Sequence, residues 1–323
     1  MFSNRSSKSG VVARALGSLA GLGALSAATA YLANREIRQF EMHEVTVPVF
    51  EPGSLPEGWG SVRVLHISDL HMTGDQKAKE DFVAGLDTTN PDLVINTGDN
   101  LTAKEGVPSV VRSLTDLMER PGAFVFGSND YLAPRPVNPF VYLVGKKHKP
   151  SEEKLPWQGM RAAFIERGWH DATHQRLEFT IAPAGVGESD YEREIKLAIA
   201  GVDDPHHELD NYDSIAGPAN PDADLKIGLS HSPEPRVLDR FAADGYHIVL
   251  SGHTHGGQLC LPGGKTVVTN CGIDRSRAKG LSRWSEKMWL HVTNGLGNSK
   301  YVPFRTFCRP SATLLHFVEK NPT

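Results

Sequence analysis

Two histidines flanked by glycines are the part of the sequence best suited to bind metal ions. They are His253 and His255, in the run GHTHGG from Gly252 to Gly257. We predict a short buried strand from Ile248 to Leu250 before them, and the glycines allow the backbone to turn where it ends. Residues two apart on an extended chain lie on one side, about 7 Å from each other, which suits neighbouring ions better than one tetrahedral site. The same pattern also occurs in loops that bind no metal. Whether this pair belongs to a metal site therefore depends on the presence of other ligands.

Four other predicted strands also end in potential metal ligands. Leu65 to Ser68 is followed by Asp69 and His71, Leu93 to Asn96 by Asp99, Ala123 to Phe126 by Asn129 and Asp130, and Leu225 to Leu229 by His231. A single Asp after a strand is usually a helix N-cap. Open α/β sheets, however, bind ligands at the carboxyl ends of their strands. Five strand ends with oxygen or imidazole ligands therefore indicate one shared site.

These motifs resemble the signature of the calcineurin-like metallophosphoesterases, which runs Asp-x-His, Gly-Asp, Gly-Asn-His-Asp/Glu, a single His and Gly-His-x-His. The resemblance extends from about Val62 to Gly257. It implies an α/β fold, a four-layer α-β-β-α sandwich of two mixed sheets. It also implies two divalent ions. Carboxylate, amide and imidazole ligands favour Mn, Fe or Zn over Mg.

The resemblance also implies which residues hold each ion. One ion would be held by Asp69, His71, Asp99 and His255, and the other by Asp99, Asn129, His231 and His253, so that Asp99 bridges them. The bound ions would generate a bridging hydroxide that attacks phosphorus in line.

The third motif departs from the family pattern, because the sequence there is Gly127-Ser128-Asn129-Asp130. Depending on the alignment, either Ser128 or Asn129 takes the place of the ligand. We favour Asn129, because a carboxamide oxygen coordinates a hard cation better than a neutral hydroxyl. In both alignments the histidine that assists the leaving group is missing.

We assign catalytic roles to Asp99, His231 and Asp130, with Asp130 or His206 as the substitute proton donor. Loss of a general acid typically costs about 10²–10⁴ in rate where a poor alkoxide leaves. We therefore expect a phosphodiester or diphosphate substrate with a good leaving group, which could be lipid-linked. The alternative is a membrane-tethered pseudoenzyme that binds metal without catalysis.

The first 41 residues differ in composition from the rest and are predicted to be a signal-anchor or signal segment and a linker. Arg5, Lys8 and Arg14 precede an uncharged run from Ala15 to Ala33, which is long enough to cross a bilayer with the remainder exported. Ala28-Thr29-Ala30 also resembles a signal-peptide cleavage site. We expect a protein of the cell membrane with its catalytic domain outside the cytoplasm, or a secreted protein if Ala30 is a cleavage site.

Residues 42–323 are predicted to form the catalytic domain, and 39% of the 323 residues are hydrophobic, which is enough for one large core. The net charge of −4 and a pI near 6.4 give no basic surface for nucleic acid. The three cysteines have no Cys-x-x-Cys spacing, although one pair could oxidise outside the cytosol. Within the domain, residues 131–150 are predicted to form an insertion, in which apolar residues with Pro134, Pro136 and Pro139 are followed by a basic cluster. It is either a cap that contacts lipid or a loop packed on the domain flank.

The helices and strands that position these residues are predicted from the spacing of apolar residues and from glycines and prolines that end a helix or strand. We predict helices at 76–90, 107–119, 155–168 and 235–243, a first strand at 44–50, and a strand pair at 177–182 and 195–200. Later strands at 258–261, 266–269, 289–293 and 312–318 are predicted to close the second sheet.

Overall fold

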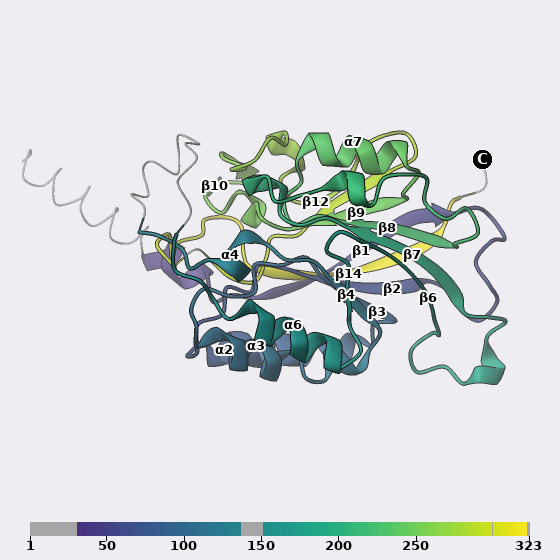
Figure 1. Cartoon of the computed structure of the whole chain (residues 1–323), viewed down its shortest axis with the longest axis horizontal. Helices are drawn as coiled ribbons and strands as arrows, with labels where there is room; N and C mark the ends of the chain where they lie inside the picture. The colour runs from purple at the N-terminus through teal and green to yellow at the C-terminus, as the bar shows by residue number, and fades with distance from the viewer. Residues whose placement is uncertain (1–30, 137–150, 299, 322–323) are drawn as a thin grey trace, which may run out of the picture.

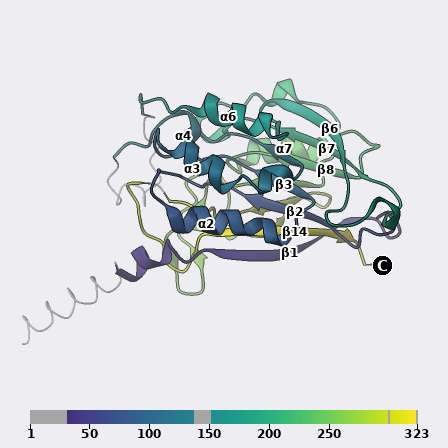
Figure 2. The same cartoon turned by 90° about the horizontal axis from the view of Figure 1, so that it is seen from below.

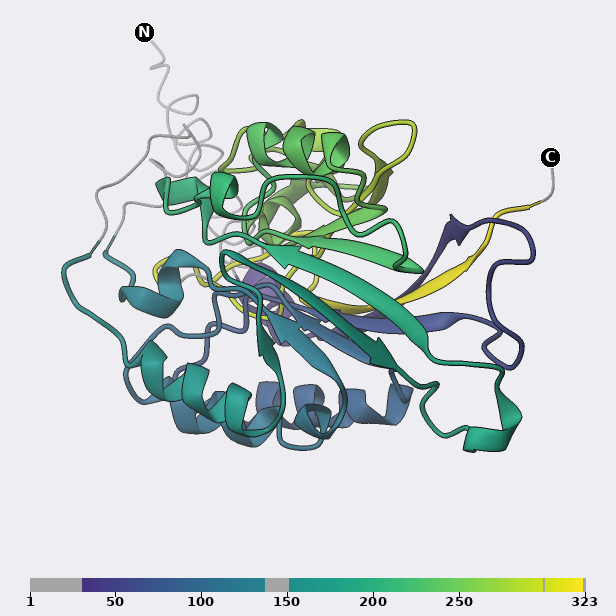
Figure 3. The same ribbon diagram turned by 45° about the vertical axis from the view of Figure 1, so that its right-hand side comes forward.

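Two six-stranded sheets lie face to face, with helices on both outer sides, in the computed structural model of the chain (Figure 1). The structure describes residues 31–136, 151–298 and 300–321. Helices α2, α3 and α6 cover the first sheet, as the view from below shows (Figure 2), and α7 covers the second, and the same order of layers is seen in Figure 3. The predicted four-layer sandwich of two mixed sheets is confirmed.

Each sheet combines parallel and antiparallel strands. The first has the order β1 (Glu41–Phe50), β14 (Ser311–Glu319), β2 (Val62–Ile67), β3 (Leu93–Asn96), β4 (Gly122–Phe124) and β5 (His170–Asp171). The second has the order β12 (Gly280–Arg283), β13 (Trp289–Val292), β9 (Ile248–Ser251), β8 (Leu225–Leu229), β7 (Ile195–Gly201) and β6 (Gln175–Ile181). The principal helices are α2 (Lys77–Gly85), α3 (Gly106–Ser113), α6 (Trp157–Glu166) and α7 (Pro235–Ala243). These bounds agree with the predicted helices, except that the predicted ranges for α2, α3 and α6 extend too far.

Three apolar clusters hold the layers together. The middle one lies between the sheets and includes Val64, Ile199 and Phe317, and a second packs the first sheet against α2, α3 and α6. The third packs the second sheet against α7 through Val237, Leu238 and Phe241. Because each sheet is buried on both faces, its parallel strands are mainly apolar, with few polar residues such as His66 in β2 and His291 in β13, and most of the polar ligands follow the strand ends.

The prediction that every late strand closes the second sheet is wrong in part. Only β13 joins that sheet as predicted, whereas β10 (Cys260–Leu261) pairs with β11 (Lys265–Thr266) in a separate hairpin. Strand β14 lies in the first sheet, parallel to β1 and antiparallel to β2. It is buried on both faces, since Leu314 contributes to the helix-side cluster and Leu315 to the middle cluster. Such a strand fits the interior of either sheet, and its pairing partner is not encoded in its own periodicity.

The parallel strands direct their carboxyl ends toward one edge of the sandwich. Pairing is parallel for β2, β3 and β4 in one sheet and for β7, β8, β9 and β13 in the other. The loops that follow β2, β3, β4, β8 and β9 therefore meet at this edge, where the short helix α4 (Ser128–Tyr131) lies (Figure 1).

Two predicted segments lie wholly or mainly outside the described residues. They are the uncharged run 15–33, of which only residues 31–33 are described, and the insertion, of which residues 137–150 are not described. Within the described part of the chain, no helix has the length and apolar character needed to span a bilayer.

Candidate metal centre

The predicted ligands lie on tight loops whose backbone is unusual. Asp69, His71, Asp99, His253 and His255 all have positive φ angles, between 44° and 68°. This left-handed conformation is uncommon for residues other than glycine, and it is typical of strained functional sites. Gly252, at the end of β9, is needed for close approach, because a Cβ there would lie 2.4 Å from Asp69 Oδ2. Local backbone strain therefore accompanies the close approach of the strand ends.

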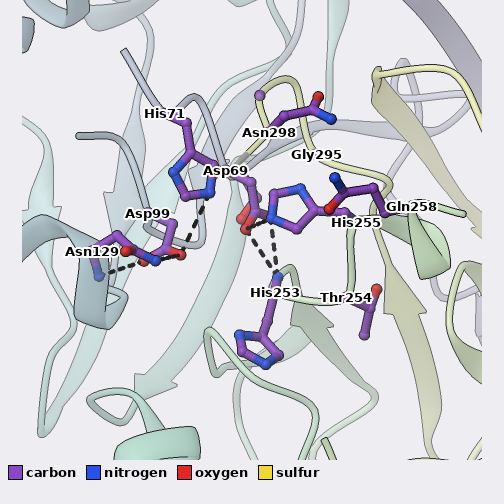
Figure 4. A network of polar contacts seen from close by, with 12 residues as sticks. Asp69, His71, Asp99, Asn129, His253, Thr254, His255, Gln258, Gly295 and Asn298 are labelled. Atoms are coloured by element: carbon purple, nitrogen blue, oxygen red, sulfur yellow. Dashed lines mark hydrogen bonds and ion pairs between the residues drawn. The ribbon is translucent and has the colours of Figure 1, made fainter. Parts of the chain in front are cut away.

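Three neighbouring residues contact the carboxylate of Asp99, and Figure 4 labels two of them, His71 and Asn129. Its Oδ2 lies 3.3 Å from Nε2 of His231 and 3.7 Å from Nε2 of His71. Asn129 donates to the same carboxylate from its backbone N at 2.9 Å and from Nδ2 at 2.7 Å. Residues that follow three strands therefore converge on one carboxylate.

Asp69 is the second carboxylate of the site, and it faces His255. His255 Nε2 lies 3.8 Å from Asp69 Oδ1, and the backbone N of His253 donates to both oxygens of Asp69. Two buried sets of three groups have their ligand atoms within 4.8 Å of one another: Asp69, His71 and His255, and Asp69, Asp99 and His231. Each set is compact enough to surround one ion.

The far nitrogens of two imidazoles fix the ring orientations. His231 Nδ1 donates to the carbonyl oxygen of Thr97 at 2.8 Å, and His71 Nδ1 lies 3.1 Å from Thr102 Oγ1. The Nε2 atoms of both rings are buried and have no hydrogen-bond partner among the described residues. Metal-binding histidines typically use one nitrogen for an orienting hydrogen bond and the other for the ion. The residues present therefore fit a pair of divalent cations.

A chain of polar contacts continues from this site to the interior between the sheets. His66 Nε2 lies 3.0 Å from Thr97 Oγ1, and His66 Nδ1 lies 2.9 Å from Nδ1 of His291 in β13. All three side chains are buried. The Thr97 turn, whose carbonyl orients His231, is thus fixed from both sheets.

The ring of His253 is placed differently from the other predicted ligands. Only its backbone contacts Asp69, and its side chain points away from Asp69 and His255 (Figure 4). The ring packs at 4.4 Å from the ring of His206 and 5.3 Å from that of His231, measured between centroids. His253 therefore lies beside the Asp99–His231 side of the centre, outside both compact sets.

At the altered third motif, the side chain of Asn129 reaches the site. It contacts Asp99 directly, whereas the backbone N of Ser128 donates to Asp204 at 3.2 Å. Rotating the Asn129 amide by 180° exchanges Oδ1 and Nδ2 at the same place, so that an oxygen can face a cation near Asp99. This placement favours Asn129 over Ser128 as the ligand.

The predicted role of Asp130 as a proton donor does not agree with its placement. Its Oδ2 accepts from the backbone N atoms of Gly127 and Asp99, and its Oδ1 accepts from those of Asn100 and Leu101. Burial and the neighbouring Asp99 raise the pKa of Asp130 to about 7, and the backbone donors oppose this shift. The carboxyl group is fully buried and holds the Asp99 and Asn129 loops together. We correct its role to that of a positioning residue.

Arg305 is a residue of the site that the sequence patterns do not reveal. Its guanidinium is completely buried, and it donates to the carbonyl oxygens of Asn294, Gly295 and Gly297 and lies 3.3 Å from Nδ1 of His255. Leu296 in the same Gly-rich turn donates from its backbone N to Ser68, next to Asp69. Arg305 thus joins the Gly-rich turn at residues 294–298 to His255 of the site. No periodicity or motif connects an arginine to a histidine 50 positions earlier.

The protonation of the site differs from one histidine to the next. Burial lowers the pKa of His71 to about 4, so this ring is neutral at pH 7. Burial also acts to lower the pKa of His231, but the Asp99 carboxylate outweighs it and raises the pKa well above the usual value. The pKa of Asp99 is correspondingly low, because His231 outweighs the effect of burial. In the metal-free chain a proton on His231 therefore stands in for a cation beside Asp99.

We predict that metal binding releases about one proton, which comes from His231. Only the neutral ring can bind an ion, and the folded-state pKa of His231 lies above 6.5, so the affinity for Mn²⁺ increases as the pH rises through the neutral range. Isothermal titration calorimetry in buffers of different ionisation enthalpy measures the released protons. His231→Asn should bind more weakly and release about one proton fewer than the wild type. Equal proton release from this variant and the wild type would contradict the assignment.

For Asp130 we predict that Asp130→Asn lowers the free energy of unfolding of the metal-free chain by about 1–3 kcal/mol, because an amide cannot accept all four backbone hydrogen bonds. Urea denaturation measures this change. Asp213→Asn is a matched control at an exposed ion pair with Arg240, where we expect less than about 1 kcal/mol. An Asp130→Asn variant as stable as the wild type would restore Asp130 as a candidate proton donor.

Known proteins similar to this chain place it in a family. The family model for the calcineurin-like phosphoesterase matches residues 62–257. A Bacillus subtilis (strain 168) protein described as uncharacterized metallophosphoesterase YkoQ is 24% identical over 292 residues, 88% of this chain and 92% of that protein. A Bos taurus protein described as transmembrane protein with metallophosphoesterase domain is 28% identical over 219 residues, 67% of this chain and 44% of that protein. The crystal structure of TT1561 of Thermus thermophilus shares 14% identity and a TM-score of 0.41, covering 73% of this chain and 90% of that one.

The family model spans the strands that end in the predicted ligands, from β2 to the His253–His255 loop. It matches more than half of the chain, and the residues that it spans include strands β2 to β9 and all the predicted metal ligands. The chain therefore belongs to the calcineurin-like phosphoesterase family.

Proposed function

We propose that this protein hydrolyses phosphoester bonds with two divalent metal ions, most suitably Mn, Fe or Zn. One observation carries the proposal: two buried imidazole nitrogens, which have no hydrogen-bond partner in the described part of the chain, face the Asp99 carboxylate, with Asp69 and His255 beside them. Family membership supports a metal-dependent phosphoesterase. The number of ions, their identity and the bond that is cleaved belong to the proposal.

Each half of the centre would hold one ion. Asp69, His71 and His255 would hold the first, and Asp99, His231 and Asn129 the second, with Asp69 close to both. Asp99 would lie between them, because its Oδ2 is 3.3 Å from His231 and 3.7 Å from His71, and His253 is close to the second ion. Two divalent ions so bound lower the pKa of a water to near neutrality and stabilise charge on a phosphoryl group. Thr97, Thr102 and Arg305 keep the rings of His231, His71 and His255 in orientation.

The protein groups near the site favour a substrate with a good leaving group. Asp130 is occupied by backbone hydrogen bonds, so it is not available to protonate a leaving oxygen. His206, the other predicted donor, packs on His253, and burial lowers its pKa to about 3. A ring that is neutral at pH 7 carries no acidic proton to give. We therefore propose a phosphodiester or diphosphate whose leaving group needs no protonation.

A lipid-linked substrate and a membrane location are the remaining parts of the proposal. They are supported by the uncharged run 15–33 in the sequence and by a relative whose description includes both a transmembrane protein and a metallophosphoesterase domain. In this arrangement the catalytic domain lies outside the cytoplasm, attached through its N-terminal segment. Cleavage after Ala30 would instead release it as a secreted protein.

We predict turnover of bis(p-nitrophenyl) phosphate by the Mn-loaded protein, and turnover slower by about 10² or more on a dialkyl phosphodiester, which has the poorer leaving group. Asp99→Asn should remove activity together with bound metal, as measured by elemental analysis. Glu105→Gln, which changes an exposed carboxylate outside the centre, is the matched control.

The outcomes separate the alternatives. Equal turnover on aryl and alkyl esters would contradict the leaving-group proposal. A chain that retains two ions and hydrolyses no ester would be the metal-binding pseudoenzyme, as the loss of the third-motif histidine allows.

A further inference from the structure

Four exposed apolar side chains gather beside the metal centre. They are Tyr31, Leu32, Leu261 and Phe307, which we call the apolar face, with exposures of 67%, 59%, 53% and 56%. Among the described residues they are the four most exposed large apolar side chains. The remaining ones, Ile165, Val186 and Leu209, are 37% to 43% exposed and belong to other parts of the fold. Apolar exposure of this kind on a folded domain marks an interaction site.

Backbone hydrogen bonds bring the three segments of the apolar face together. The backbone N of Cys260 donates to Thr306 at 3.0 Å, which joins β10 to the loop that carries Phe307. The backbone N of Arg305 donates to Ala33 at 3.1 Å. The Glu36 carboxylate accepts from the backbone N atoms of Phe307 and Cys308, at 3.1 and 2.6 Å. The face is therefore a fixed part of the domain.

The position of Phe307 is itself unusual. Its φ angle is 52°, a conformation that a bulky aromatic residue rarely adopts, and its side chain is exposed all the same. The hydrogen bond to Glu36 keeps the backbone in this conformation. Phe307 thus has a strained backbone although its side chain is exposed. Such strain is typical of residues that contact a ligand or partner.

The charges around the apolar face are mainly positive. Arg35, Arg38 and Lys265 are exposed, and Lys279 reaches Cys260 with its Nζ at 3.8 Å from the sulfur. The segments 261–266 and 303–309 contain no acidic residue, and Glu36 is occupied by the backbone. Apolar side chains interspersed with cations are the composition that binds the interface of an anionic bilayer.

The chain path points to the same surface. Tyr31 and Leu32 lie at the C-terminal end of the uncharged run 15–33, so this run meets the folded domain at the apolar face. Residues 31–36, drawn in purple, lie at the same end of the molecule as β10 and α4 (Figure 1). Arg305, two residues before Phe307, contacts His255 of the metal centre. The metal centre and the apolar face are therefore neighbours.

We propose that the apolar face rests on the surface of a bilayer that contains anionic lipid, in addition to any attachment through residues 1–30. Leu261 and Phe307 enter the interfacial region, and the surrounding lysines and arginines meet lipid phosphates. This second attachment fixes the orientation of the domain and keeps the metal centre near the membrane surface, where a lipid-linked substrate is presented.

The test uses the full chain reconstituted into vesicles of phosphatidylcholine and phosphatidylglycerol. Leu261→Cys and Phe307→Cys are labelled with an environment-sensitive fluorophore, and quenching by spin-labelled lipid is measured. Ile165→Cys and Leu209→Cys are matched controls on other exposed apolar positions, and the unsubstituted chain gives the background from its own cysteines. All variants share the same N-terminal segment, so differences between them report only the contact of the folded domain.

We expect severalfold stronger quenching at positions 261 and 307 than at positions 165 and 209, and weaker quenching in vesicles of phosphatidylcholine alone. Equal quenching at all four positions would overturn the proposal, as would failure of the full chain to associate with vesicles. Fluorophores at 261 and 307 that are already shielded in detergent solution would show that a second copy of the chain covers the face, and would also overturn it.

Discussion

The rest of this structure depends on one buried negative charge, the carboxylate of Asp99, which requires cationic partners. Asp99 is only 2% exposed, and an isolated carboxylate at such a site costs several kcal/mol in solvation. Two hydrogen bonds from Asn129 and the protonated ring of His231 compensate it in the metal-free chain. Asp69, less than 5 Å from these ligand atoms, adds a second buried carboxylate whose pKa burial raises to about 6. This cluster is therefore most stable when cations replace the protons.

The rest of the fold keeps these charges in place. The two sheets bring strand ends from opposite halves of the chain to one edge, and the layers of helices bury their outer faces. Behind the ligands, Asp130 ties the Asp99 turn to the Asn129 loop, and Arg305 ties the Gly-rich turn to His255. The His66–His291 contact connects the two sheets directly beneath the site. A centre supported in this way is preorganised, so little reorganisation is needed when a phosphoryl group arrives.

Sequence patterns predicted the parts of the structure that local chemistry determines. The apolar strands, their polar ends and the helix α7 could be located because burial on both faces and turn-forming residues leave clear signals. The sheet that contains β14 could not be predicted, because a strand buried on both faces fits either sheet. Arg305 was missed because its contacts are with distant backbone carbonyls, which leave no pattern in the sequence.

Asp130 shows how residue type alone can mislead. Its position beside Asn129 suggested a proton donor, but the side chain lies three residues after Gly127 in the first turn of α4 and accepts the Gly127 backbone N–H. An acidic residue in this position commonly caps a helix by such a bond, so the Gly-x-x-Asp spacing held the structural signal. Asn129 was predicted to be a metal ligand. Its side chain does reach Asp99, and its role as a ligand stays a prediction.

The most direct test of the account is anomalous diffraction from crystals of the protein soaked in Mn²⁺. The account predicts two peaks about 3.5–4 Å apart. One should lie among Asp69, His71 and His255, and the other beside Asp99, His231 and Asn129. A single peak, or peaks away from Asp99, would contradict the claim that this carboxylate joins two cations.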